Sequence, residues 1–386
     1  MNGDTAGATM RIGARNPFVY AEHVLKEKIK WNRLGPGQKR KKLEKAFGMP
    51  YNQLFDPLKG SPLFVKIVQA NVNTGDLRPC TTVSNPTWAL NPAGSNYTVA
   101  TRAHTDLVQG DLPDCFFIAA LSSVAFSAPA LIPDKPSTPY SYTFYNPPAV
   151  EGGTPVADTP ISVSNLLPLD PAGKYHYSKS FTAGEIWPAM YEKAFASWKG
   201  SRTDKPDYSI ICQGDPVLAL MNLTGWRFTT YKPGTDPVTS TASRYSTQNF
   251  SDGTKIYNKI NSVCQYTGPY RTTSKPMVAY TYDPRIERPP SGITYSDATI
   301  VGNHSYSVLG VHSVGAENYI VMRNPWGQKG AGPGSGDPDP SQLPAGALAA
   351  GAWYQIANLA DANDAIFALK ASVFRDYFKG FGWVYQ

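Results

Sequence analysis

The chain has few cysteines, and no two of them are spaced as a metal-binding or dithiol motif requires. None of the four stands in a C-x-x-C arrangement, so a zinc finger is not expected. The sequence also lacks a signal peptide, an apolar run long enough to cross a bilayer and an EF-hand loop pattern. These absences predict a cytoplasmic protein with no transmembrane segment and no calcium sensor of the EF-hand kind.

The composition is that of a folded protein with many loops. Apolar residues make up 41% and charged residues 17% of the 386 residues, which is enough apolar material for two core-bearing lobes. The net charge of +7 is concentrated at Lys39-Arg40-Lys41-Lys42, in a helix expected over 36–47. This cluster is either the solvated face of a helix or a docking site for an acidic partner. No nucleic-acid motif occurs, so nucleic acid is not expected as a partner.

The stretch from Gln109 to Leu121 carries the most informative cysteine. Cys115 starts an apolar, Ala-rich run that is expected to form a buried helix, and the helix dipole favours a thiolate there. The amide of Gln109 could donate to an oxyanion that forms when this thiolate attacks a carbonyl. The alternative is that Cys115 is a small core residue. If Cys115 is a free thiol, three cysteines remain, which argues against a disulfide framework.

A base and its orienting group are found far downstream of this cysteine. His304 begins an alternating pattern typical of a strand, and a second strand candidate ends at Asn324. Gly315 between them predicts a hairpin-like connection, which would bring Asn324 close to the imidazole. Its carboxamide oxygen could then accept from one ring nitrogen, and Trp326 could shield that bond from water. The alternative readings are a structural histidine and an ordinary Asn-Pro turn.

Several motifs, in this order, resemble those of the calpain-type cysteine proteases of the papain fold. They are Gln-Gly-x-Leu-x-Asp-Cys ending at Cys115, a Glu-x-Trp helix over 185–195, His-x-Tyr-Ser-Val from His304, Arg-Asn-Pro-Trp-Gly from Arg323, and a Phe-rich close over 366–378. The resemblance runs from about residue 100 to the end. It implies an α+β fold with two lobes, a helical lobe that bears the cysteine and a β-rich lobe that bears the histidine and asparagine.

The resemblance also implies roles for single residues in the cleavage of peptide bonds in protein substrates. Cys115 would be the nucleophile, His304 the general acid and base, Asn324 the orienting group and Gln109 the oxyanion donor. Substrate-binding positions correspond to Gly214, Asn303 and Trp326. Because Gln213-Gly214 and Asn303 depart from the family's glycines, two alternatives stay open: a weakly active or inactive scaffold that binds other proteins, and an acyl-transfer enzyme with the same Cys/His chemistry.

Asp106 and Glu185 resemble calcium ligands of the cysteine-bearing lobe in this family. Two carboxylates and loop carbonyls near residue 100 are the oxygen ligands that Ca²⁺ prefers. The alternative is that Asp106 caps a turn and Glu185 belongs to the start of a helix. The sequence therefore leaves calcium open as a cofactor and requires none.

Three segments are expected along the chain. Residues 1–97 form an N-terminal extension with helices over 21–32 and 36–47 and a strand over 63–68; it could be a pro-segment, a lid or a docking surface. Residues 98–225 form the cysteine-bearing lobe and residues 226–386 the His/Asn-bearing lobe. A Gly-, Ala- and Pro-rich stretch over 328–350 is expected to form a loop or flap beside the active site.

Overall fold

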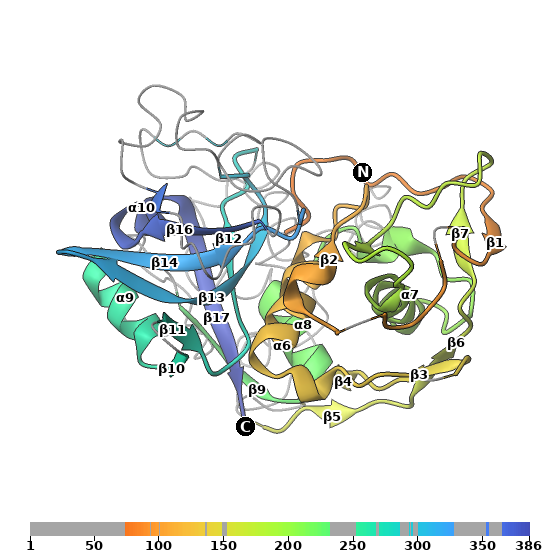
Figure 1. Ribbon diagram of the computed structural model, residues 1–386, viewed down its shortest axis with the longest axis horizontal. Coiled ribbons are helices and arrows are strands. Elements are labelled where there is room, and N and C mark those ends of the chain that lie inside the picture. Colours follow the sequence, from red (N-terminus) through yellow and green to blue (C-terminus); the bar gives the residue numbers. More distant parts are fainter. Residues whose placement is uncertain are drawn as a thin grey trace, which may run out of the picture.

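The computed structural model describes most of the chain from residue 74 onward. The described residues are 74–92, 94–99, 101–135, 137–148, 153–231, 252–267, 270–285, 293, 295, 300–327, 353–354 and 365–386. The elements expected before residue 70, the basic cluster and the flap over 328–350 lie outside the described residues. In the described part the fold is of the α+β class, with the large sheet on one side and most of the small strands on the other (Figure 1).

One antiparallel sheet of nine strands forms the β-rich half of the molecule. Its main path runs β15-β16-β14-β13-β12-β17-β9, and β11 pairs with both β13 and β10. The strands are β9 (Arg227–Tyr231), β10 (Cys264–Thr267), β11 (Tyr270–Thr273), β12 (Met277–Thr281), β13 (Ser305–Val314), β14 (Glu317–Arg323), β15 (Trp353–Tyr354), β16 (Ile366–Lys370) and β17 (Phe378–Tyr385).

The central strand β12 is buried on both faces because helices cover the sheet from both sides. Val278 and Tyr280 join the core that contains α6 (Cys115–Ser127) and α8 (Pro216–Thr224). Met277 and Ala279 point the other way, into a core shared with α9 (Gly253–Asn261) and α10 (Ala371–Tyr377). This alternation follows from the two-residue period of a strand.

The hairpin expected downstream of His304 is confirmed. β13 pairs antiparallel with β14, and His312 lies opposite Tyr319 in the register. Gly315 in the turn has a φ of 59°, a left-handed conformation that glycine adopts without steric cost. The hairpin therefore brings the end of β14, where Asn324 follows, back to the start of β13, where His304 precedes.

The expected helix at Cys115 is also confirmed and is fastened directly to the sheet. α6 begins at Cys115 and is buried along nearly its whole length, as its apolar sequence predicts. The Ser123 hydroxyl donates to the carbonyl of Met277 at 2.8 Å and accepts from its amide at 2.7 Å. Ser307 of β13 donates to the carbonyl of Ala119 at 2.7 Å. These bonds fix the helix that carries the thiol against β12 and β13.

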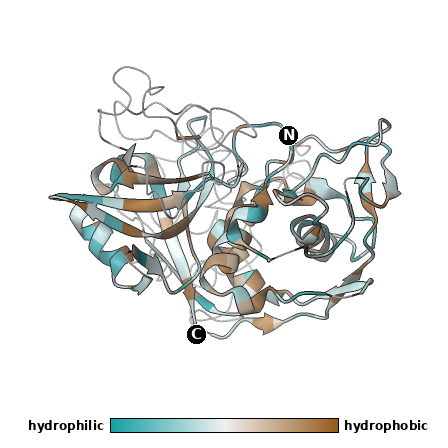
Figure 2. Ribbon diagram, in the orientation of Figure 1, coloured by the Kyte–Doolittle hydropathy of each residue, from teal (hydrophilic) through white to brown (hydrophobic). Residues whose placement is uncertain are grey.

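The remaining elements surround α7 (Trp187–Lys199) on the other side of α6. Figure 2 shows apolar residues concentrated on α6. The short elements are β1 (Thr87–Ala89), β2 (Leu107–Val108), β3 (Tyr140–Tyr142), β4 (Tyr145–Asn146), β5 (Val156–Ala157), β6 (Ile161–Val163), β7 (Leu167–Leu169), β8 (Lys179–Ser180), and the 3-10 turns η4 (His104–Asp106), η5 (Pro129–Leu131) and η6 (Tyr208–Ile211).

The sequence argues against a disulfide framework, but the structure contains one disulfide. Cys80 and Cys212 form a disulfide, whereas Cys115 and Cys264 are free. The sequence separation of 132 residues hides this pairing from any reading of local spacing. Among the described residues, no helix combines the length and apolar character needed to cross a membrane.

Candidate active site

The structure brings the expected nucleophile and base together. Cys115 lies at the first position of α6 and His304 directly before β13, and neither side chain is exposed. The Cys115 sulfur, a ring nitrogen of His304 and a carboxylate oxygen of Asp76 all lie within 4.8 Å of one another. The first two residues were expected here and the third was not.

Asn324 holds the imidazole as the hairpin predicts. Nε2 of His304 lies 3.0 Å from Oδ1 of Asn324, and this oxygen also accepts from the amide of Trp326 at 3.1 Å. An amide oxygen only accepts, so Nε2 carries the proton and Nδ1 is left for the thiol. The ring of Trp326 lies 5.0 Å from the imidazole ring, and the ring of Tyr306 stands edge-on to it at 4.9 Å. Both aromatic rings shield the pair from water.

Burial keeps both reacting groups neutral in this arrangement. Desolvation lowers the pKa of His304 to about 4, although the Asp76 carboxylate and Asn324 oppose this effect. Desolvation raises the pKa of the Cys115 thiol well above its ordinary value, and the negative charge of Asp76 raises it further. The expectation that the helix dipole produces a thiolate is therefore wrong for this arrangement, because desolvation and a neighbouring anion outweigh the dipole.

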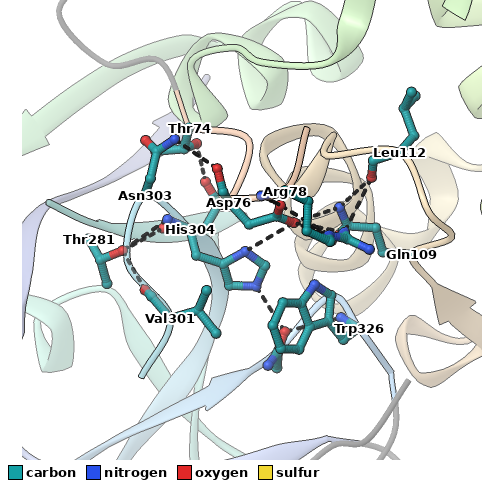
Figure 3. Close-up of polar contacts among 12 residues, drawn as sticks. Thr74, Asp76, Arg78, Gln109, Leu112, Thr281, Val301, Asn303, His304 and Trp326 are labelled. Atoms are coloured by element: carbon teal, nitrogen blue, oxygen red, sulfur yellow. Dashed lines mark hydrogen bonds and ion pairs between the residues drawn. The ribbon is translucent and has the colours of Figure 1, made fainter. Parts of the chain in front are cut away.

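Asp76 enters the site from the N-terminal side, and no sequence pattern points to it. Its side chain is fully buried, and its Oδ2 lies 3.9 Å from Nδ1 of His304. Arg78 clamps the carboxylate with Nε at 3.0 Å from both oxygens and Nη2 at 2.7 Å from Oδ2 (Figure 3). Arg78 also donates to the carbonyl of Gly110 at 2.9 Å, which ties this segment to the loop before α6.

Gln109 lies beside the thiol but already has partners. Its Nε2 donates to the carbonyl of Leu112 at 2.7 Å and to Oδ2 of Asp76 at 3.3 Å. Its backbone amide donates to the carbonyl of Pro325 at 2.8 Å, which connects the loop to the end of the hairpin. The side-chain amide thus points at the Asp76 carboxylate (Figure 3), an oxygen of which lies within 4.8 Å of the Cys115 sulfur.

Two of the expected substrate-binding positions contact a segment of this same chain. Gly214 exchanges backbone hydrogen bonds with Thr74 at 2.9 and 3.1 Å, forming an antiparallel bridge. The carbonyl of Asn303 accepts from the amide of Gly75 at 3.1 Å, and Nδ2 of Asn303 donates to the carbonyl of Asp76 at 3.0 Å. Asn303 has a φ of 54°, which asparagine tolerates better than most residues. The third position, Trp326, packs on His304 and lies under the guanidinium of Arg78.

Asp106 and Glu185 lie close together, as calcium ligands would. Burial, together with the charge of Glu185, raises the pKa of Asp106 to about 6. Protein donors already contact all four oxygens: Ala103 and Thr182 bond Asp106, whereas Val99, Ser180 and Trp187 bond Glu185. Among the described residues no lysine or arginine pairs with either carboxylate. Two buried carboxylates without a cationic partner fit a hard cation.

A second pair of buried acids lies beneath the catalytic helix. Asp114 precedes Cys115, and Glu192 is on α7; neither is exposed. Burial and the charge of Glu192 raise the pKa of Asp114 well above its ordinary value, so Asp114 is protonated and donates to Glu192. Glu192 also accepts from the amide and hydroxyl of Ser178 at 2.9 and 2.8 Å. The pair therefore shares one proton at neutral pH.

We expect this shared proton to make the protein less stable as the pH rises. The pKa of Glu192 is raised from 4.5 to about 7 by burial, so the folded state holds more protons than the unfolded state between these values. Stability therefore falls as the pH rises through this window, and it keeps falling above it because the folded state still holds the proton on Asp114. In the Glu192→Gln variant this fall should shrink by more than about 1 kcal/mol, measured by denaturant unfolding across the window. The exposed control, Glu317→Gln, should keep the wild-type slope, and an unchanged slope in Glu192→Gln would contradict the shared proton.

A buried thiol at a helix start, beside an imidazole that a carboxamide holds, defines a cysteine hydrolase of the papain arrangement. The model of the calpain family of cysteine proteases matches residues 77–335, more than half of the chain. The chain belongs to the calpain family of cysteine proteases.

Curated relatives agree with this family. A thiol protease of Porphyromonas gingivalis is 29% identical over 234 residues, which are 57% of this chain and 44% of that protein. The calpain-type cysteine protease DEK1 of Arabidopsis thaliana is 25% identical over 225 residues, 58% of this chain and 9% of that protein. The human calpain-1 catalytic subunit is 25% identical over 259 residues, 65% of this chain and 30% of that protein. The chain thus spans less than half the length of each of these three relatives.

Proposed function

We propose that this protein is an endopeptidase that hydrolyses peptide bonds of protein substrates through Cys115, His304 and Asn324. The observation that carries the proposal is the 3.0 Å contact between Nε2 of His304 and Asn324, which leaves Nδ1 on the side of the buried thiol. A histidine that served only the fold would need a partner on each nitrogen, whereas Nδ1 is buried without a hydrogen-bond partner.

The reaction needs the imidazole to move one proton twice. His304 takes the proton of Cys115 as the thiolate attacks the carbonyl carbon, and then gives it to the departing amine. This leaves a thioester on Cys115, which water hydrolyses after His304 removes a proton from the water. The backbone N–H of Cys115 and the amide of Gln109 are the proposed donors to the oxyanion. Gln109 can serve only after the Asp76 carboxylate leaves its amide.

A thiol-directed epoxide probe tests this proposal. Incubation with the purified protein, followed by peptide mapping, should place the label on Cys115 and leave the second free cysteine, Cys264, unlabelled. Burial raises the pKa of Cys264 to about 12, and its Sγ donates to the carbonyl of Ile260 at 3.3 Å. Labelling of Cys264 with Cys115 unmodified would contradict the proposal.

A second function, a scaffold that binds proteins without cleaving them, has one observation in its favour. The thiol is neutral and a carboxylate lies beside it, which is the arrangement of a site that does not react. A protein that never reacts with the probe, with or without calcium and in every variant described below, would favour this second function. Docking of an acidic partner to the basic cluster at 39–42 remains a prediction from the sequence.

Calcium is proposed as a ligand of Asp106 and Glu185. It would neutralise two buried carboxylates that repel each other, so its binding should raise the melting temperature. Saturation to about 100 times the dissociation constant contributes about 2.7 kcal/mol. The Glu185→Gln variant should lose this calcium-dependent rise in melting temperature. Magnesium, which demands near-octahedral geometry and gives up its water reluctantly, should give little rise in the wild type. An equal calcium response in both proteins would exclude the site.

A further inference from the structure

The segment 74–78 of the chain lies in the chain's own candidate active site. Thr74, Gly75 and Asp76 are buried, and the chain re-emerges at Leu77, whose side chain is 38% exposed. The segment is fastened to groups from both sides of the cleft. On the side of the helical elements these are Gly214, Gln109 and Gly110; on the side of the sheet they are Asn303, Ser305 and Trp326.

The backbone of this segment is held as an extended peptide, in a fixed register to the thiol. Thr74 forms its antiparallel bridge with Gly214, and its hydroxyl lies 2.5 Å from that of Ser305. The next amide, that of Gly75, donates to the carbonyl directly before His304, at 3.1 Å. Two successive residues are thereby fixed by main-chain bonds that do not depend on side chains, which is how an extended peptide is bound in general.

This register sets one peptide bond at the sulfur. The backbone N–H of Asp76 interacts with Cys115 and opposes the rise of its pKa. That nitrogen belongs to the peptide bond between Gly75 and Asp76. Beyond this bond Asp76 has a φ of 48°, so the chain turns away in a left-handed conformation. The bond next to the sulfur is therefore the one at which the extended part ends.

The position before this bond accepts only glycine. A Cβ atom on Gly75 would lie 2.3 Å from the carbonyl oxygen of Cys212 and 2.6 Å from that of Pro113. Both obstacles are backbone atoms, which do not move aside as the tip of a flexible side chain does. The carbonyl oxygens of Cys212 and Pro113 therefore leave room only for glycine at this position, and the chain has Gly75 there.

We infer that the Gly75–Asp76 bond is a substrate of this active site and is cut within the same molecule. The inference rests on the proposed function, because it uses the same thiol and imidazole. The sulfur of Cys115 forms a bond to the carbonyl carbon of Gly75, the bond from that carbon to the nitrogen of Asp76 breaks, and His304 delivers a proton to that nitrogen. Water then hydrolyses the thioester, which releases residues 1–75 with a Gly75 carboxyl group and restores the thiol.

The Asp76 side chain prevents cleavage of the Gly75–Asp76 bond until this side chain moves. Its carboxylate fills the place beside the amide of Gln109 that the oxyanion of Gly75 needs, and Arg78 holds it there. Removing this carboxylate frees Gln109 and removes the anion nearest to the thiol. Asp76→Ala should therefore speed the cut at the same bond by at least about tenfold, a loss of one charge-assisted contact.

The experiment follows the purified full chain over time by intact mass and by sequencing of the new amino terminus. The wild type should yield a fragment that begins at Asp76, at a first-order rate that does not change with protein concentration. Cys115→Ala should stay intact. A rate that rises with concentration would overturn cutting within one molecule, and a wild type that stays intact while it cleaves an added peptide would overturn the inference but leave the proposed function standing.

Two variants in the segment separate the geometry from general instability. Gly75→Val should slow this cut by at least about 100-fold, because its side chain cannot fit between the two carbonyls. It should at the same time react faster with the epoxide probe, since the cleft opens. Leu77→Ala, at the exposed neighbouring position, should be cut at the wild-type rate. Wild-type cutting of Gly75→Val would overturn the inference, and failure of both cutting and probe labelling in all proteins would count against the proposed function itself.

Discussion

Replacing Cys115 by alanine is expected to abolish peptide hydrolysis, with a loss of at least about 10⁴-fold in kcat. No other thiol can substitute for it in the described part of the chain, because Cys264 lies elsewhere and Cys80 and Cys212 are paired. The rate is measured on an unfolded protein substrate and on the epoxide probe, and both reactions should vanish together.

The control for this variant is its stability. Cys115 is fully buried at the start of α6, so truncation removes one small side chain and leaves the packing of the helix in place. The melting temperature should therefore change little or rise, because the variant no longer buries a thiol next to the Asp76 carboxylate. Retained hydrolysis in a folded Cys115→Ala protein would assign the chemistry to another group.

Replacing Asn324 by alanine is expected to lower kcat about 100-fold and to change KM little, since the side chain positions the imidazole and does not touch the substrate. Its oxygen accepts from Nε2 of His304 and from the amide of Trp326, so the variant leaves two buried donors without a partner. Loss of a partner for a buried donor costs about 1–3 kcal/mol, which differential unfolding measures.

The aspartate variant separates positioning from stability. Asn324→Asp keeps an acceptor at the same place and adds a negative charge, which favours the protonated imidazole and raises the pKa of His304 from its low value of about 4. The acid limb of the pH–rate profile should shift upward in Asn324→Asp, whereas Asn324→Ala should lower the rate without this shift. A loss of stability in either variant without any change in kcat would reduce Asn324 to a structural role.

The sequence predicted the three separated residues of the site because local patterns determine where each one lies. An apolar run that begins at Cys115 can only form a buried helix, and alternation from His304 onward can only form a strand. A glycine turn then returns the chain to Asn324. Each side chain stands at the end of a regular element, so the placement of the elements also fixes the side chains. The family resemblance supplied the peptide substrate, which these patterns do not encode.

Other features depend on contacts between distant segments that no local pattern reveals. Asp76 lies in a Pro-, Asn- and Thr-rich stretch without periodicity, and only the folded chain places it between Cys115 and His304. The pairing of Cys80 with Cys212 has the same origin. The state of the thiol was mispredicted for a related reason: the helix dipole is a local effect, whereas desolvation and the Asp76 charge arise from tertiary structure.

The disulfide determines what a cut after Gly75 would leave behind. Cys80 follows Asp76 closely, and Cys212 directly precedes the Gln213-Gly214 wall of the cleft. The new amino group on Asp76 would therefore stay close to the sulfur, because residues 76–80 tether it to the disulfide. It would not diffuse away with residues 1–75. An ammonium group held there favours the ionised form of the nearby Cys115 thiol, so the cleaved protein would be more reactive than the intact one. Reduction of the disulfide would release this tether and weaken the effect.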